Sequence, residues 1–366
     1  MSNAKLPPGA TAVSVKMINP VNFGPAILKR FMAPDVPGLE TFPSSPSLSF
    51  LIEHPSGRKL VWDLGIRKDY QNYAPTIANY IPTTKYDIKV TKSVAEILEE
   101  NGVDLNEVEA VIWSHWHWDH IGDPSTFPTS TDLVVGQGFK EAMLPGAPAN
   151  PVSPLLESDY LGRNLREINF NGTGPEHLTI GNFPAFDYFG DGSFYLLDSP
   201  GHAVGHLCGL ARTTTGAGQD EPQSTFVLMG GDVCHYAGIM RPSKYLPVPE
   251  SITPHPCHPH DASSMLCPGG AWDELQKSRG RTSTDTLYDP TFGHDIPLAI
   301  NTVRSLQELD CDENVFVIIA HDSTVRDAVD HFPASLNEWK TRGWGQRTKW
   351  AFLKDLGTYW DSKAEA

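Results

Sequence analysis

Short apolar runs that lead directly into polar loops dominate the pattern of this chain. Alternating or continuous apolar positions predict β-strands at residues 11–17, 47–53, 59–62, 110–113, 193–197, 225–229 and 315–319. The last four strands each run into a loop that carries His or Asp, at residues 114–120, 198–202, 230–232 and 320–322. Because strands hold such loops in place, we expect these side chains to form one site.

Two segments have the spacing and end signals of amphipathic helices. At residues 93–102, Ser93 and Glu96 form a capping box and Gly102 ends the helix. A second helix is predicted at residues 296–309, with Asp295 as its N-cap and Pro297 in its first turn.

Three stretches lack a clear periodic pattern and are rich in aromatic residues or in Pro and Gly. They are residues 66–90, 137–190 and 237–293. Segments of this length within a compact domain usually form lids or binding loops. We therefore expect a single domain over residues 1–366, in which these insertions, including residues 250–270, line a substrate pocket.

Composition and charge narrow the classes of partner. The 366 residues carry a formal net charge of -16, which argues against a nucleic acid and against an anionic membrane surface as partners. No secretory signal is recognisable, and no apolar run of about 18 residues exists to span a membrane. The five cysteines are scattered, so we expect a cytoplasmic protein with reduced thiols, in which Cys257 and Cys267 would pair only after export.

The densest chemical signal is a His-x-His-x-Asp-His motif at residues 115–120. Imidazole and carboxylate groups suit zinc, manganese or iron, and alternate residues of a tight loop can face two ions close together. A His- and Asp-rich surface loop is the alternative. It is disfavoured because three further ligand candidates follow later strands, so that the full set is His115, His117, Asp119, His120, His202, Asp232 and His321.

The order of these motifs resembles the metallo-β-lactamase superfamily over residues 11–322, and within it the dinuclear lactonase-like branch. That branch includes the acyl-homoserine lactonases, and the sequence around the motifs is similar to fungal members. The resemblance implies an α/β fold, a four-layer αββα sandwich with long loop insertions, and two zinc ions at one edge, with manganese, iron and cobalt as alternatives. It also implies that His115, His117 and His202 hold one ion, that Asp119, His120 and His321 hold the other, and that Asp232 bridges both.

One position departs from the family. Acyl-homoserine lactonases have a tyrosine three residues after the bridging aspartate, where it binds the substrate carbonyl. Here that position is His235, and Tyr236 follows it. We expect His235 to take the role, with Tyr236 as the alternative.

Three further features have two interpretations each. His206 fits a supporting position behind the ligands better than a ligand position. His255, Cys257, His258 and His260 offer a third metal site, but the prolines between them favour a pocket-lining loop. Trp116 and Trp118 either line the substrate site or pack against the sandwich.

The resemblance implies hydrolysis by a metal-bridging hydroxide, with Asp119 carrying the proton to the leaving group. We expect the substrate to be a small, neutral or modestly apolar molecule, a lactone or related carboxylic ester. The alternatives are a thioesterase of the glyoxalase II or polyketide type and a non-catalytic binding protein on the same fold. The charge disfavours nucleic-acid phosphodiesters, and a flavodiiron-type oxidoreductase would need a carboxylate in place of His117.

Overall fold

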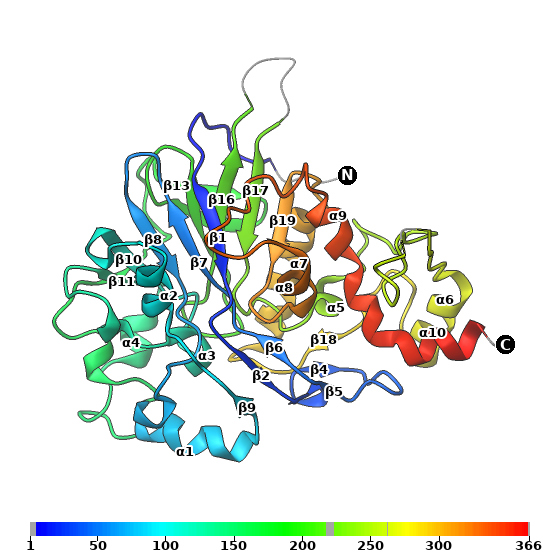
Figure 1. The fold of residues 1–366 in the computed structure, drawn as a ribbon, viewed down its shortest axis with the longest axis horizontal. Helices are drawn as coiled ribbons and strands as arrows, with labels where there is room; N and C mark the ends of the chain where they lie inside the picture. Colours follow the sequence, from blue (N-terminus) through cyan, green and yellow to red (C-terminus); the bar gives the residue numbers. More distant parts are fainter. Residues whose placement is uncertain (1–4, 217–222, 262, 365–366) are drawn as a thin grey trace.

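The computed structural model describes residues 5–216, 223–261 and 263–364. Within these residues two six-stranded sheets face each other, with helices on both outer sides (Figure 1). The first sheet contains, in spatial order, β1 (Ser14–Ile18), β7 (Ser49–Glu53), β8 (Lys59–Trp62), β10 (Val108–Ile112), β11 (Asp132–Val135) and β12 (Leu165–Glu167). The second contains β13 (His177–Ile180), β14 (Phe183–Asp187), β15 (Phe194–Asp198), β16 (Leu207–Thr214), β17 (Thr225–Met229) and β19 (Val315–Ile318).

Alternation along the strands produces the layers. In β7, Phe50 and Ile52 point into the core between the sheets, whereas Leu51 between them points outward. The inner core also receives Leu196 and Val227 from the second sheet. Because successive side chains of a strand point to opposite faces, both faces of each sheet are buried and helices cover the outer ones. The expected αββα sandwich is confirmed.

The helices have the following bounds: α1 (Pro75–Thr84), α2 (Val94–Glu100), α3 (Trp118–Ile121), α4 (Phe139–Met143), α5 (Ala237–Met240), α6 (Gly269–Ser278), α7 (Ile296–Asp310), α8 (Ser323–Ala328), α9 (Trp344–Lys349) and α10 (Gly357–Ala364). Both predicted helices are present. The capping box closes α2, since Ser93 Oγ accepts from Glu96 N at 3.2 Å and Glu96 Oε2 accepts from Ser93 N at 2.7 Å. Asp295 caps α7 by accepting from Leu298 N at 3.0 Å.

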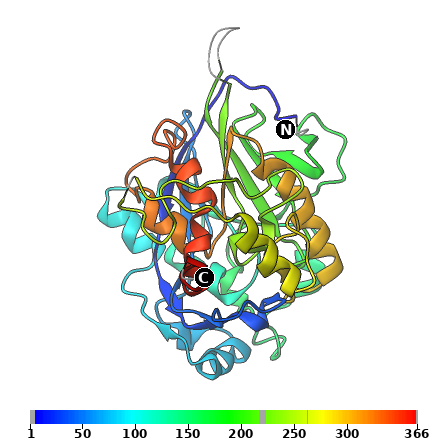
Figure 2. The same cartoon turned by 90° about the vertical axis from the view of Figure 1, so that its right-hand side faces the viewer.

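Helices α6, α9 and α10 lie on one side of the molecule (Figure 2). Tyr359 Oη of α10 donates to Ala271 O of α6 at 2.7 Å, and Lys363 pairs with Glu274 at 2.7 Å. The predicted insertion at 237–293 is thus largely ordered structure, and residues 137–190 likewise contain α4, β12, β13 and β14. Residues 137–190 thus supply three strands of the two sheets, and residues 237–293 pack against the second sheet, which their lack of clear periodicity did not reveal.

A group of very short strands at the lower edge in Figure 1 was not predicted. It comprises β2 (Asn22–Gly24), β3 (Ala26–Ile27), β4 (Met32–Ala33), β5 (Thr41–Phe42), β6 (Ser45–Pro46), β9 (Asp87–Ile88) and β18 (Asp289–Pro290). They pair as β6-β2-β9, β3-β5 and β18-β4. Strands of two or three residues are too short to produce a period-two signal.

Two smaller expectations can be compared directly with the structure. All five cysteines are free, so Cys257 and Cys267 are not paired. In the described part of the chain, no helix has both the length and the apolar character needed to cross a membrane.

Candidate metal centre

The seven predicted ligand side chains meet at one edge of the sandwich. They come from four loops, which follow β10, β15, β17 and β19. The structure groups them as His115, His117, His202 and Asp232, and as Asp119, His120, Asp232 and His321. In each group the candidate ligand atoms lie within 4.8 Å of one another, and Asp232 belongs to both groups.

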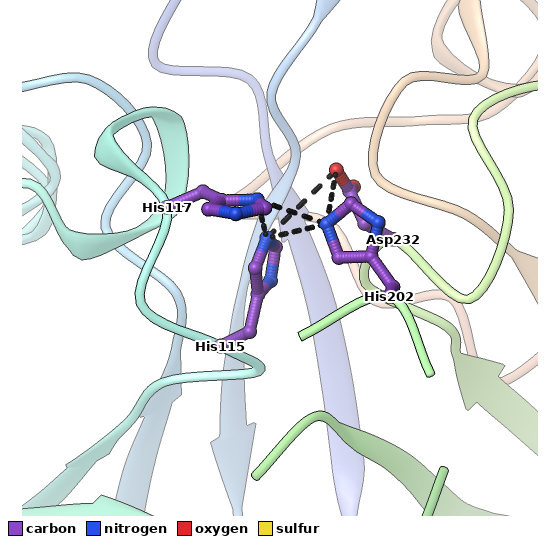
Figure 3. Close-up of side chains that lie close together, drawn as sticks. All are labelled: His115, His117, His202 and Asp232. Carbon is purple, nitrogen blue, oxygen red and sulfur yellow. Dashed lines mark hydrogen bonds and ion pairs between the residues drawn. The ribbon is translucent and has the colours of Figure 1, made fainter. Parts of the chain in front are cut away.

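In the first group three imidazole nitrogens point toward one another (Figure 3). His202 Nε2 lies 3.1 Å from His115 Nε2 and 2.9 Å from His117 Nδ1. Burial lowers the pKa of His115 and His202 well below the usual value and lowers that of His117 to about 4. Neutral imidazoles with converging lone pairs are the donors that a divalent transition metal prefers.

The second group combines two histidines with two carboxylates. Asp232 Oδ1 lies 3.2 Å from His120 Nε2 and 3.1 Å from His321 Nε2, and Asp119 Oδ2 lies 3.5 Å from His321 Nε2. His120 Nε2 and Asp232 Oδ1 are buried without a hydrogen bond. Buried polar atoms normally have partners, so these two atoms fit a cation between them.

The pKa shifts in this second group also favour a cation between the ligands. Burial lowers the pKa of His120, but Asp232, Asp63 and Asp119 outweigh that effect and raise it well above its usual value. Burial raises the pKa of Asp232, but the surrounding histidines, His321 first, lower it well below the usual range. The carboxylates therefore attract positive charge, and a metal cation can supply it in place of protons.

Backbone geometry allows Asp232 to reach both groups. Gly231 has a φ of +51°, and a Cβ at this position would come within 2.8 Å of Ser114 Cβ. Residues with a Cβ rarely adopt this conformation, and glycine also leaves room for the neighbouring loop. The Gly-Gly-Asp sequence thus has a structural reason.

Asp63 supports the centre and was not identified from the sequence. Its Oδ2 lies 2.9 Å from His120 Nδ1, and its Oδ1 accepts a hydrogen bond from Ser114 N at 2.6 Å. Holding the Nδ1 proton leaves His120 Nε2 free to bind a metal. The signal was present, because Asp63 directly follows β8 just as the other site residues follow their strands.

His206 lies behind the ligands, the supporting position that we expected. Its Nε2 accepts from Asp232 N at 3.0 Å, and its Nδ1 lies 2.8 Å from Ser199 Oγ. His321 is oriented in a similar way, since its Nδ1 donates to Pro46 O at 2.8 Å. These contacts fix which ring nitrogen faces the cluster.

His235 and Tyr236 occupy different environments. His235 Nε2 lies 3.3 Å from Asp232 Oδ2, and its ring centroid lies 4.8 Å from that of His202. Tyr236 Oη instead donates toward Phe352 O at 2.9 Å and Asp355 Oδ2 at 3.0 Å, within the apolar core outside the second sheet. The hydroxyl of Tyr236 is thus directed away from the ligands, which is contrary to the alternative we had left open.

An open cavity, with about 650 Å³ of space that includes the solvent at its mouth, lies over the two ligand groups. Apart from ligands, His235 and Ser45, its lining is apolar or aromatic: Phe23, Ala26, Leu28, Phe31, Met32, Phe42, Tyr80, Tyr86, Trp118 and Phe292. Trp118 therefore lines the site, whereas Trp116 does not. The ring centroid of Trp116 lies 4.6 Å from that of His117.

The expectation that the three predicted insertions line the pocket is largely wrong. The predicted insertions contribute only Tyr80 and Tyr86, from the first, and Phe292, at the end of the third. None of the described residues in 137–190 or 250–270 lines the cavity. The short strands at residues 22–46 supply most of the wall instead.

The third metal site considered at residues 255–260 is not supported in the described part of the chain, where only the two groups above have metal-ligand geometry. The rings of His255 and His258 lie with their centroids 5.1 Å apart and are tilted by 40°. The Cys257 thiol lies 3.7 Å from Lys354 O. These contacts are those of a surface turn.

Together, the two sheets, the ligand-bearing loops and the shared aspartate define a metallo-hydrolase of the β-lactamase type. Residues 43–212 match the family model described as the Metallo-beta-lactamase superfamily. The chain belongs to this superfamily, and it is a metal-dependent hydrolase.

Individual relatives add detail. The chain is 42% identical over 372 residues to Gamma-lactamase FDB1 of Fusarium pseudograminearum, covering 97% of this chain and 87% of that protein. It is 42% identical over 355 residues to a Penicillium roqueforti protein named Cytochrome P-450 monooxygenase mpaDE, covering 96% of this chain. The chain spans only 38% of the length of that second relative.

A solved structure supports the fold. An N-acyl homoserine lactone hydrolase with the product N-hexanoyl-L-homoserine bound at its catalytic metal center superposes with a TM-score of 0.56. The match covers 89% of this chain and all of that one at 18% identity, so it concerns the fold alone.

Proposed function

We propose that this chain is a two-metal hydrolase that opens a lactone or a related carboxylic ester. The observation that carries the proposal is the pair of ligand groups that share Asp232 beneath an aromatic cavity. His115, His117 and His202 would hold one ion, and Asp119, His120 and His321 the other. Zinc is the default metal for this donor set, with manganese, iron and cobalt as alternatives.

When bound, the two ions supply a water molecule of lowered pKa and polarise the substrate carbonyl. Asp119 lines the cavity and would pass the proton of the attacking water to the leaving oxygen. His235 lines the same cavity beside Asp232 and would donate a hydrogen bond to the carbonyl oxygen.

The cavity wall supports an uncharged, apolar substrate. Its acidic members, Asp119 and Asp232, belong to the ligand groups, and no Lys or Arg is among the lining residues. Apolar walls around a few polar groups are typical of sites for small organic molecules. An extended phosphodiester would find no cation here apart from the metals.

Opening of a γ-lactam is the second candidate. It is supported by the relative named Gamma-lactamase FDB1, which matches 97% of this chain at 42% identity. A lactam requires the same attack on an acyl carbon but releases an amine, which must be protonated as the bond breaks. Asp119 would serve both reactions.

The test is a substrate panel with the zinc-loaded chain. It contains γ- and δ-lactones, γ-lactams, acyl-glutathione thioesters and an aryl phosphodiester. A pH indicator follows acid release from the esters, and chromatography follows the γ-lactams, because their opening to an ammonium carboxylate releases no net proton. We expect turnover of at least one lactone, loss of it with a chelator, and recovery with zinc. Turnover of γ-lactams alone would favour the second candidate, and turnover of thioesters alone would contradict both.

A further inference from the structure

Tyr86 lies in the wall of the cavity, between α1 and β9. Its ring stacks on Trp118, with centroids 6.5 Å apart and an interplanar angle of 29°, and lies 5.5 Å from the ring of Phe23. The indole of Trp118 and the ring of Phe23 also contact each other at 5.6 Å. These rings hold the phenol in place as part of the aromatic wall.

The hydroxyl of Tyr86 is available, whereas those of the tyrosines around it are engaged. Tyr80 Oη accepts from Arg30 Nη2 at 2.8 Å, and Tyr73 Oη donates to Trp118 O at 2.6 Å. Within the described residues no hydrogen-bond partner exists for Tyr86 Oη, although the residue is half-buried. Of the two tyrosines that line the cavity, Tyr86 is the one whose hydroxyl has no protein partner among the described residues, whereas Arg30 holds the hydroxyl of Tyr80.

Tyr86 and Asp119 line the same cavity. Trp118, on which Tyr86 stacks, directly precedes Asp119 in the chain. Burial raises the pKa of Tyr86; Arg30 lowers it, while Tyr80 and the Asp119 carboxylate raise it further. The phenol therefore keeps its proton at neutral pH and remains a hydrogen-bond donor.

On the basis of the proposed function, we propose that Tyr86 contacts the substrate and donates a hydrogen bond to the ring oxygen of the lactone. This is the atom that Asp119 would protonate and that becomes the alcohol of the product. His235, whose ring lies 4.8 Å from that of His202, serves the carbonyl oxygen instead. Tyr86 thus donates to the ring oxygen of the lactone, and His235 donates to its carbonyl oxygen.

The chemistry requires no proton from the tyrosine. The attacking water forms the new C–O bond, its proton passes to Asp119, and the ring C–O bond breaks as the leaving oxygen takes that proton. Negative charge grows on the leaving oxygen before the proton arrives. A neutral phenol donor stabilises that charge and, after the reaction, binds the product hydroxyl.

The first test is equilibrium binding to the zinc-loaded protein. Two ligands are compared by calorimetry, the hydroxy acid that lactone opening produces and the same acid without its hydroxyl. Loss of one hydrogen bond should weaken binding of the hydroxy acid to Tyr86→Phe by roughly 3- to 10-fold, with no change for the deoxy acid. Tyr245→Phe is the matched control, because its hydroxyl bonds Glu308 outside this cavity.

Equal weakening for both acids, or for neither, would overturn the proposal. This comparison does not require turnover, so it is separate from the proposed function, which fails if the parent opens no lactone.

Leaving-group dependence provides the second test. In Tyr86→Phe, kcat should fall further for lactones of alkyl alcohols than for lactones of phenols, because a phenolate needs less stabilisation. An equal fall for both classes, at unchanged zinc content, would assign Tyr86 to another part of the substrate and contradict the inference.

Discussion

At the scale of single residues, His235 and Tyr236 illustrate how adjacent side chains reach different environments. The backbone at Tyr236 is extended, with φ −155° and ψ 141°. In extended backbone, neighbouring side chains point to opposite sides. His235 therefore faces Asp232 and the cavity, while Tyr236 enters the core between Phe42 and Phe352.

This difference yields a paired prediction. His235→Ala should lower kcat/KM by roughly 10- to 1000-fold, because one donor to the reacting carbonyl is lost. Tyr236→Phe should leave kcat/KM unchanged and cost about 1 kcal/mol of unfolding free energy, because its hydroxyl bonds only within the core. Steady-state kinetics and urea denaturation, at equal zinc content, measure both effects. The opposite pattern would place Tyr236 in the reaction.

Asp63 permits a test of the support behind the ligands. Asp63→Asn replaces the carboxylate that holds His120 Nδ1 with a neutral amide. Zinc affinity of the group containing Asp119, His120 and His321 should fall by about 10- to 100-fold. Competition with a chelator measures this, and Asp132→Asn, whose carboxylate bonds Asn164 elsewhere, is the control. Equal affinities in the two variants would show that Asp63 has no such role.

At the scale of elements, the ends of the long strands carry the chemistry and the short strands form the wall. β10, β15, β17 and β19 were predictable because each has at least four apolar positions before its polar loop. The strands at residues 22–46 were not, since two or three residues carry no periodic signal. They find their places through pairing with distant segments, such as β2 with β9 and β4 with β18.

The corrected wall gives a prediction about specificity. Phe31, whose ring lies 5.1 Å from that of His235, lines the cavity, whereas Met265 of the 250–270 segment is exposed outside it. Phe31→Ala should raise KM by roughly 3- to 30-fold with zinc content unchanged, because apolar contact with the substrate is lost. Met265→Ala should have no effect on KM. A change in KM for Met265→Ala alone would restore the original expectation.

At the scale of the whole molecule, the gathering of the ligands was expected from their positions after strands, whereas the sandwich was implied by the resemblance to the metallo-β-lactamase superfamily. The motifs at residues 115–120, 202, 232 and 321 each follow a strand, and strands of one sandwich bring their loops to a common edge. The direction of individual side chains did not follow in this way. The side chain of Tyr236 depends on local backbone angles and long-range packing, which no spacing rule contains. Asp63 has the position after a strand that the ligands share, but its contact with His120 Nδ1 depends on how the two loops meet.

The free energy of unfolding also depends on pH, and the buried carboxyl group of Asp198 contributes to that dependence. Burial raises the pKa of Asp198 to about 6, whereas the pKa of an aspartate in an unfolded chain is about 3.9. Because the pKa of Asp198 is higher in the folded state than in the unfolded state, the carboxyl group stabilises the fold below about pH 4. This stabilisation is lost as the pH rises through about 6. Asp198→Asn should therefore match the parent at about pH 4 and exceed its unfolding free energy by about 1–2 kcal/mol at about pH 8. Denaturation of both proteins at the two pH values measures this, and a constant difference would refute it.

The central claim is that two ions, joined by Asp232, act as one hydrolytic centre. The most direct measurement is titration of the metal-stripped chain with zinc, with bound zinc and the rate of lactone opening recorded together, for the parent and for Asp232→Ala. Each of the two ligand groups should bind one ion in the parent, and the rate should be complete only when both are filled. Asp232→Ala should bind both ions weakly and lose activity. Full activity after the first ion, or tight binding of both ions by Asp232→Ala, would contradict the claim.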